Sequence, residues 1–371
     1  MNKIFDIKPL GFLIGVFTLS LSFTSLRGAS SAGILELILL ILIGIYCLRH
    51  FFLERQEIEW PSFIPLIFII IIVTPLTIIN WAQDFYGSSF TTLAALIFAS
   101  LIGAVSYSFD HYYRYSFSIG VGISIFFIIC YILISGDLFA TVARFAFLSA
   151  NPNILALYSI CSCFLISFFS PKGIIRYLLI LSAIFYGGIA LSDSFFLAIA
   201  MGLLIACFSF LYWKEVLPGF IFVALVLILI ILINFELNPI TYIINLWNQA
   251  DQGGARIALI KNGIEAYLHS PIIGHGAGAF AGMYHAFGRF EAHNTYIDLL
   301  TIGGPVLTVI FVIPLLTTLL YLHKKKEYLA LAFLIAILFF SFFHFTARHP
   351  IIWSVWGFCL ALVYSSQSKT N

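Results

Sequence analysis

The sequence predicts an all-α polytopic membrane protein, and three of its features agree on this. Of the 371 residues, 62% are hydrophobic and only 9% are charged, and the mean hydropathy is +1.07. Soluble domains carry about 25% charged residues, so this chain has too few charges to cover a surface in water. Apolar runs of about 20 residues, the length of a helix that crosses a bilayer, recur along the sequence.

The apolar runs predict about twelve transmembrane helices. Only Ser192, Asp193 and Ser194 separate the seventh and eighth runs, so these two helices should form a tight hairpin. The predicted spans are residues 9–26, 33–49, 62–79, 89–108, 116–135, 153–170, 174–191, 195–212, 216–234, 300–322, 328–345 and 350–366.

Three regions follow from this pattern. Residues 1–234 form a transmembrane bundle of about nine helices, residues 235–299 form a long loop, and residues 300–371 hold about three C-terminal helices.

The distribution of positive charge predicts the orientation in the membrane. Twelve of the 18 Lys and Arg residues fall on the side of the N-terminus and six on the other side. Short cytoplasmic loops are enriched in Lys and Arg, so both termini should be cytoplasmic and the loop should face outward. The net charge of +2 gives no sign of a nucleic-acid partner.

The long loop concentrates the titratable groups, which are costly near hydrocarbon and so point to chemistry. It contains His269, His275, His285 and His293, which lack the close spacing of zinc ligands. We therefore expect neither a metal site nor a cofactor. His293 is the best candidate for a general base, because an imidazole exchanges protons near neutral pH. Taken alone, a histidine is more often structural.

A helix is predicted within the loop from Ala255 to His269, after a break at residues 251–254, and it should lie along the outer membrane surface. Arg256 then falls in the first turn, where its guanidinium and free backbone N–H groups would hold an anion. The alternative is an arginine that reaches lipid headgroups. Residues 274–278, which include three glycines, should form a flexible turn.

Other polar residues have two interpretations each. Arg144 lies in an apolar outer segment and either binds phosphate or contacts headgroups, and Arg289 is a less distinctive cation of the loop. Asn153 is expected to cap the helix that follows, with a polar substrate contact as the alternative. Arg348 should anchor the chain at the interface. The roles of Asp193, as a base or counter-ion, and of Glu36, inside the second span, stay open.

Several motifs in order resemble the O-antigen ligase and polymerase superfamily of bacterial membrane glycosyltransferases. The resemblance covers the chain from about residue 140, and the order of motifs is more specific than any one of them. The matching pieces are Ala150-Asn151-Pro152-Asn153, Gly253-Gly254-Ala255-Arg256, His269-Ser270-Pro271-Ile272-Ile273-Gly274-His275-Gly276, and His293-Asn294-Thr295-Tyr296-Ile297-Asp298-Leu299-Leu300 with Gly304 beyond. The chain departs from the family at Leu307, where a second glycine is common, and at Phe195, where many members have arginine.

The resemblance implies transfer of a glycan from undecaprenyl diphosphate to an acceptor hydroxyl, at the periplasmic face of the bacterial inner membrane. The fold should be similar to C-type glycosyltransferases, and the reaction should invert the anomeric centre without a metal. The acceptor would be lipid A-core for an O-antigen ligase, which we favour, or a growing glycan for a repeat-unit polymerase. Membrane lipid is the further partner. A transporter of lipid-linked oligosaccharide is the alternative from another class.

The candidate residues suit this chemistry. Arg144 and Arg256 would neutralise the departing diphosphate, with each charge-assisted hydrogen bond contributing about 1.5–3 kcal/mol. Arg289 is expected to bind the diphosphate or the glycan. His293 would accept the proton of the acceptor hydroxyl. Asn153 and Asn294 are expected to contact substrate, and Asn294 would also orient the imidazole. The sequence leaves open whether Arg256 and His293 meet.

Overall fold

The computed structural model is helical throughout the part that it describes. The described residues are 7–22, 33–54, 60–80, 88–135, 151–170, 173–189, 192–208, 251–278 and 291–367. The helices are α1 (Pro9–Ser20), α2 (Ile34–Cys47), α3 (Ile64–Phe68), α4 (Thr74–Asn80), α5 (Ser88–Tyr107), α6 (His111–Ser135), α7 (Pro152–Phe169), α8 (Ile174–Ile189), α9 (Asp193–Phe208), α12 (Asp251–His269), α13 (Thr295–Lys324), α14 (Tyr328–Phe340) and α15 (Pro350–Gln367), with shorter turns η2 (Leu48–Leu53), η3 (Trp60–Phe63) and η4 (Ile69–Val73).

The helix composition is that of a multi-pass membrane protein. Among the described residues, six helical segments are long and apolar enough to cross a bilayer, and five shorter helices are also apolar. Together they coincide with eleven of the predicted spans, and the predicted span at 216–234 lies outside the described residues. The predicted boundary at residue 300 falls inside α13, which begins at Thr295.

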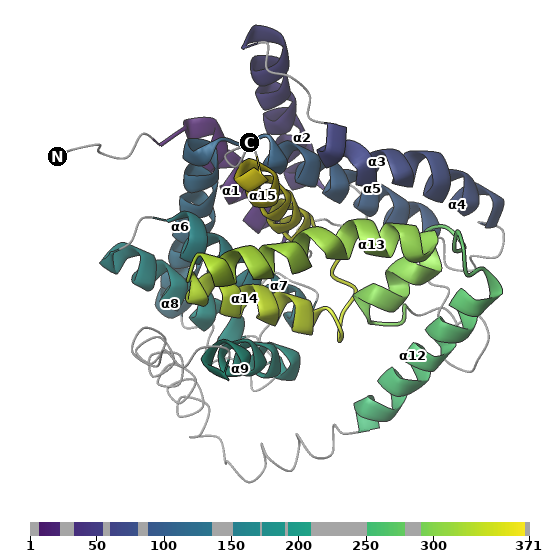
Figure 1. Ribbon diagram of the computed structural model, residues 1–371. Coiled ribbons are helices and arrows are strands. Elements are labelled where there is room, and N and C mark those ends of the chain that lie inside the picture. The colour runs from purple at the N-terminus through teal and green to yellow at the C-terminus, as the bar shows by residue number, and fades with distance from the viewer. Residues whose placement is uncertain are drawn as a thin grey trace.

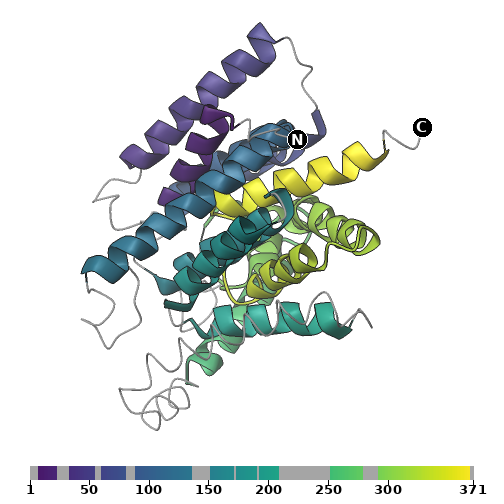
Figure 2. The ribbon, with the colours of Figure 1, turned by 90° about the vertical axis from the view of Figure 1, so that its left-hand side faces the viewer.

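Glycines allow pairs of helices to approach closely, as is common in membrane bundles. A Cβ atom built at Gly15 of α1 or at Gly202 of α9 would lie 2.3 Å from a backbone oxygen of the partner helix, α6 or α14. A Cβ atom at Gly357 of α15 would lie 2.2 Å from the carbonyl oxygen of Gly103 in α5. Figure 2 shows α1 between α2 and α6, and α1 packs against both of them.

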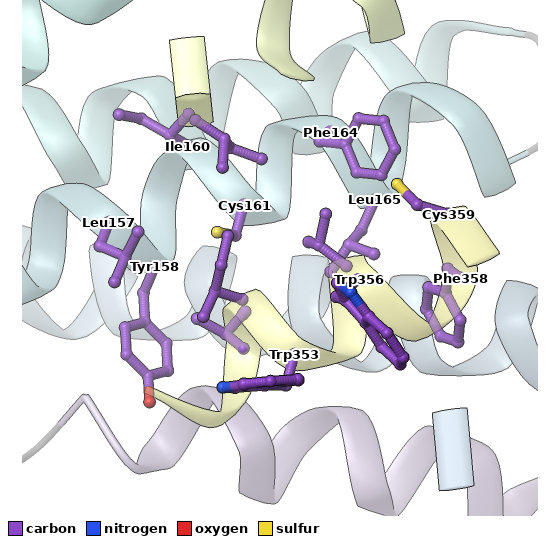
Figure 3. Close-up of a cluster of buried hydrophobic side chains, with 14 of the residues drawn as sticks. Leu157, Tyr158, Ile160, Cys161, Phe164, Leu165, Trp353, Trp356, Phe358 and Cys359 are labelled. Atoms are coloured by element: carbon purple, nitrogen blue, oxygen red, sulfur yellow. The ribbon is translucent and has the colours of Figure 1, made fainter. Parts of the chain in front are cut away.

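The centre of the bundle is a cluster of aromatic and aliphatic side chains between α7 and α15 (Figure 3). Trp353 and Trp356 are almost completely buried there, and their indole N–H groups donate to the carbonyl oxygens of Ala347 (2.5 Å) and Ile310 (3.1 Å). Cys161 and Cys163 are buried in α7 and so pack within the bundle. This core holds α7, α13 and α15 in fixed positions, and these helices carry the polar network described below.

One polar residue of the second span has a local explanation. Glu36 lies in the first turn of α2, and its carboxylate accepts the backbone N–H of Gly33 (3.1 Å). This is half of a capping box, which satisfies an N–H group that the helix leaves without a partner. The role of Glu36, which the sequence left open, thus includes capping of α2.

Helix α13 is broken near its beginning. Gly303 and Gly304 have non-helical backbone angles, and Gly304 has a positive φ of 67°. The break frees the carbonyl groups of Thr301 and Ile302, which accept the N–H groups of His275 (2.7 Å) and Gly276 (2.9 Å). A break within a membrane helix requires such replacement partners, and the loop after α12 supplies them.

The loop around His275 and Gly276 is held in place by several hydrogen bonds, so the flexible turn expected at residues 274–278 is not observed. His275 also accepts, through its carbonyl oxygen, the side-chain amide of Asn80 in α4 (2.7 Å), and its ring Nε2 lies 2.7 Å from the carbonyl oxygen of Ala266. Gly274 has a φ of 73°, and a Cβ atom there would lie 2.7 Å from the carbonyl oxygen of Thr301. The glycine is needed for both reasons. In Figure 1, α12 (green) lies at the lower right, and its upper end leads to this docked loop.

Candidate functional site

His293 occupies the turn that leads into α13. Its φ is 51°, in the left-handed region that few residues other than glycine adopt, although histidine is enriched there among those that do. The side chain is half-buried. Residues held in this region cluster at functional sites, where the surrounding structure fixes the backbone.

Asp298 fixes the backbone on both sides of His293. Its Oδ1 accepts the N–H of Ala292 (2.7 Å), and its Oδ2 accepts the N–H of Asn294 (3.2 Å). Asp298 is only 4% exposed, so its two oxygens are used inside the protein. A single buried carboxylate thus holds the residues before and after His293. Sequence reasoning assigned no role to Asp298, because it placed the start of this span at residue 300, whereas α13 begins at Thr295.

Asn294 is the N-cap of α13. Its Oδ1 accepts the N–H groups of Tyr296 (3.1 Å) and Ile297 (3.2 Å), and the residue is buried. N-cap asparagines satisfy N–H groups that a helix itself leaves unpaired. The side-chain oxygen of Asn294 therefore stabilises the helix that carries Asp298 and sets where His293 lies.

A second set of contacts joins this turn to the segment between α14 and α15. The N–H of Thr295 donates to the carbonyl oxygen of Ser341 (2.8 Å), and its hydroxyl donates to the carbonyl oxygen of His344 (2.6 Å). In return, the N–H of Thr346 donates to Oγ1 of Thr295 (2.8 Å). Thr295 and Thr346 are both completely buried. The histidine turn is thus attached to a segment that lies about 50 residues away in the sequence.

An ion pair reinforces this attachment at the surface. Arg348 forms a salt bridge through Nη1 with Oε1 of Glu291, two residues before His293. The guanidinium also lies 5.9 Å from the ring centre of Phe345. The expectation that Arg348 anchors the chain at the membrane interface missed this role, because the partner comes from a distant segment.

Asn153 does not cap α7, so that expectation is wrong. The cap is Asn151, whose Oδ1 accepts the N–H of Asn153 (2.8 Å), with Pro152 as the first helical residue. Proline prefers this first position, so the sequence itself favoured Asn151. Asn153 instead accepts the hydroxyl of Ser192 through Oδ1 (2.6 Å).

The structure places Asn153 and the histidine turn at the same end of the bundle through the α8–α9 hairpin. Ser192 contacts Asn153, and Ser194, two residues later, lies with its hydroxyl 3.1 Å from Nε2 of His344. The carbonyl group of His344 in turn accepts from Thr295. A continuous series of polar contacts therefore connects Asn153, the hairpin and the segment that holds His293.

Arg256 lies farther into its helix than expected. Helix α12 begins at Asp251 and runs through Gly253 and Gly254, so the predicted break at 251–254 is wrong. The N–H groups left free at a helix start belong to its first four residues, and Arg256 lies beyond them. The anion site expected at Arg256 therefore has no free backbone N–H groups beside the guanidinium. The side chain of Arg256 is outside the described residues, as is that of Asp193.

Arg144 and Arg289 lie outside the described residues altogether, as does His285. Two other loop histidines have structural contacts. Nδ1 of His269 lies 2.8 Å from the carbonyl oxygen of Glu265, and His275 contacts Ala266 as described above. Within the described ranges, His, Cys, Asp and Glu side chains form no group of three or more with the geometry to hold a metal ion.

Comparison with known proteins identifies one family. Residues 156–312 match the model described as O-antigen ligase, which is less than half of the chain. The matched region runs from α7 through the break in α13 and includes Arg256, His293 and Asn294. The comparison with curated proteins yields no match. Residues 156–312 are therefore similar to the O-antigen ligase family, and the resemblance read from the sequence is confirmed over this region.

Proposed function

We propose that this protein is an O-antigen ligase, which transfers a glycan from undecaprenyl diphosphate to a sugar hydroxyl of lipid A-core. The observation that carries the proposal is the position of His293. It lies within the region that matches the ligase family, on a turn held by Asp298 and Thr295. A half-buried imidazole on a rigid turn suits a general base, because proton transfer depends on fixed geometry.

In the proposed reaction, His293 takes the proton of the acceptor hydroxyl as its oxygen attacks the anomeric carbon. The bond from that carbon to the diphosphate oxygen breaks, and undecaprenyl diphosphate leaves with the electron pair. Attack opposite the leaving group inverts the anomeric centre. General base catalysis of this kind contributes about 10² to 10⁴ in rate.

Cationic side chains would stabilise the departing diphosphate, and we assign this role to Arg256, Arg144 and Arg289. Negative charge builds on the phosphate oxygens as the bond breaks, and guanidinium groups bind such oxygens in pairs. Asn153 and Asn294 would contact the glycan through their amide N–H groups, because the side-chain oxygen of each accepts a hydrogen bond from the protein.

For the membrane arrangement, we propose twelve spans in the inner membrane, cytoplasmic termini and a periplasmic site, in a fold similar to C-type glycosyltransferases. Residues 1–234 and 300–371 would form the spans, and residues 235–299 the periplasmic loop. The distribution of Lys and Arg supports this orientation. Labelling of single cysteines by a membrane-impermeant reagent tests it, and labelling at either terminus in intact spheroplasts would overturn it.

The decisive experiment compares two histidines of the same loop. Purified protein is mixed with a lipid-linked glycan and rough lipopolysaccharide, and attachment of glycan to core is measured. His293→Asn removes the imidazole while asparagine tolerates the left-handed backbone, so the rate should fall about 10² to 10⁴-fold. His269→Asn makes the same chemical change at an exposed histidine and should retain activity.

Two results would change the proposal. Full transfer by His293→Asn would remove the histidine from the mechanism. Longer lipid-linked glycans without attachment to core would identify a repeat-unit polymerase, which uses the same donor and would keep the same dependence on His293.

A further inference from the structure

Helix α12 presents a largely apolar side to its surroundings. Four of its exposed side chains recur every three or four residues and so lie along one side of the helix: Ile257, Lys261, Ile264 and Leu268. The opposite side is buried, and its residues are small or polar apart from one leucine: Leu259, Asn262, Gly263 and Ala266. A helix beside water has the reverse pattern, with polar residues outward. The exposed side of α12 therefore suits an apolar environment.

Two isoleucines of the loop after α12 add to this surface. Ile272 is 76% exposed and Ile273 is 46% exposed. Both lie against the break in α13, because a Cβ atom built on Gly304 would meet the carbonyl oxygen of Ile272 and would lie 3.2 Å from the backbone nitrogen of Ile273. The apolar stripe therefore runs along α12 and ends beside α13; its members are Ile257, Ile264, Leu268, Ile272 and Ile273.

The surface of α13 beyond this break is apolar too. Helix α13 is long and apolar enough to cross a bilayer. Its exposed side chains in this part include a row that again recurs every three or four residues: Val306, Val309, Ile313, Leu316 and Leu320. Such side chains of a membrane span contact acyl chains, which are as apolar as they are. Val306 closely follows Gly304, so the apolar stripe of α12 meets the lipid-facing surface of α13 near the break.

A second span holds the same loop. The N–H of Ala277 donates to Oγ1 of Thr77 in α4 (2.8 Å), and α4 forms the end of the apolar segment Trp60–Asn80. Ile78 and Ile79, which follow Thr77, are exposed. In Figure 1, α4, one end of α13 and the upper end of α12 come together at the right of the molecule. The loop at the end of the apolar stripe is therefore fixed between two spans that both expose apolar side chains.

We propose that the apolar stripe is immersed in one leaflet of the membrane, where it contacts the acyl chains of lipids. Membrane lipid is the occupant because the stripe joins the lipid-facing surfaces of two spans, and a surface this apolar is unusual beside water. Lys261, between Ile257 and Ile264, fits this position, since its long side chain reaches from an apolar surface to the phosphates of the headgroups. Part of the segment expected as a loop then belongs to the membrane. This proposal does not depend on the glycosyltransfer activity.

The test places a small fluorophore, NBD, at single introduced cysteines of the full-length protein in phosphatidylcholine vesicles. The stripe positions are Ile264→Cys, Leu268→Cys and Ile272→Cys. The lipid control is Ile313→Cys on α13, and the water control is Lys325→Cys, at an exposed position directly after α13. The native protein, taken through the same labelling, gives the background from its own cysteines. Two quenchers are compared: a lipid with a spin label on its acyl chain, and iodide on both sides of the vesicle.

At the stripe positions, we expect the spin-labelled lipid to quench the fluorescence as strongly as at Ile313→Cys. Iodide should quench at least about fivefold less than at Lys325→Cys, because an ion is excluded from hydrocarbon. Quenching by iodide as strong as at Lys325→Cys would show that the stripe faces water. Quenching by neither agent would show that protein covers it, such as a second copy of this chain. Either result would overturn the proposal, and Ile257→Cys replaces any stripe variant that does not fold.

Discussion

Helices α13 and α8 differ in whether the polar groups near their starts have hydrogen-bond partners. At the start of α13, the N–H of Asn294 donates to the carboxylate of Asp298, that of Thr295 donates to Ser341, and those of Tyr296 and Ile297 donate to the side chain of Asn294. All four N–H groups that a helix leaves free have protein partners there. Around the connection from α7 to α8, two buried polar side chains lack hydrogen-bond partners: Ser170, directly after α7, at Oγ, and Arg176, in the first turn of α8, at Nε.

The start of α13 has a clear consequence for the site. A helix beginning that the protein satisfies completely can position a side chain but has no N–H group left for an anion. In the proposed ligase reaction, the N-terminus of α13 therefore positions His293, and the diphosphate must be held by arginines from other segments.

The largest loss of stability and of glycan transfer should come from Asp298→Ala. The change leaves the N–H groups of Ala292 and Asn294 buried without an acceptor, at a cost of about 1–3 kcal/mol each. It also releases the turn around His293, so glycan transfer should fall together with stability. Denaturation of the protein in detergent and the transfer assay measure the two effects.

Asp110→Ala is the control for Asp298→Ala. Asp110 accepts the N–H of Tyr113 at the start of α6 through Oδ1 (2.8 Å), so its loss also removes a capping carboxylate. Stability should fall by about 1 kcal/mol, and transfer by the folded protein should persist. Equal loss of transfer in both variants would show that Asp298 acts only through general stability.

Asn294→Ala should lower stability and glycan transfer less than Asp298→Ala does. It removes the cap of α13 but leaves the carboxylate of Asp298 in place. Loss of an asparagine cap costs about 0.5–2 kcal/mol. Asn294→Asp keeps an oxygen acceptor for the N–H groups and should restore most of this stability. A loss as large as that of Asp298→Ala would mean that the cap, and not the carboxylate, holds the turn.

The smallest change in the free energy of unfolding is expected from Ser170→Ala, measured in detergent. Its hydroxyl has no protein partner, so an apolar replacement should be neutral or slightly stabilising. The comparison with Asn294→Ala is direct, because both changes remove a buried polar group beside a helix end. A cost above about 1 kcal/mol would show that Ser170 has a partner within the protein.

The membrane helices and the family were predictable from the sequence, since both depend on local patterns. Composition and apolar runs identified the helices, and ordered motifs identified the O-antigen ligase region. His293 was also predicted as the candidate base, and the structure explains how its backbone is held, while its catalytic role awaits the transfer assay.

The partners of these residues could not be predicted, because they come from distant parts of the chain. Nothing near Thr295 in the sequence indicates contacts with Ser341 and Thr346, and nothing near Glu291 indicates Arg348. The start of α12 was missed for a different reason. Two adjacent glycines normally weaken a helix by about 1 kcal/mol each, yet α12 continues through Gly253 and Gly254.

The break at Gly303 and Gly304 divides α13 into a short first part, which follows His293, and a long second part within the bundle. The first part ends on the carbonyl groups that receive His275 and Gly276, so it shares a joint with the end of α12. The short part is therefore held at both of its ends: the loop after α12 bonds to its last carbonyl groups, and the segment between α14 and α15 bonds to Thr295 at its start. Through this short part, the backbone of the loop after α12 is connected to the turn that carries His293.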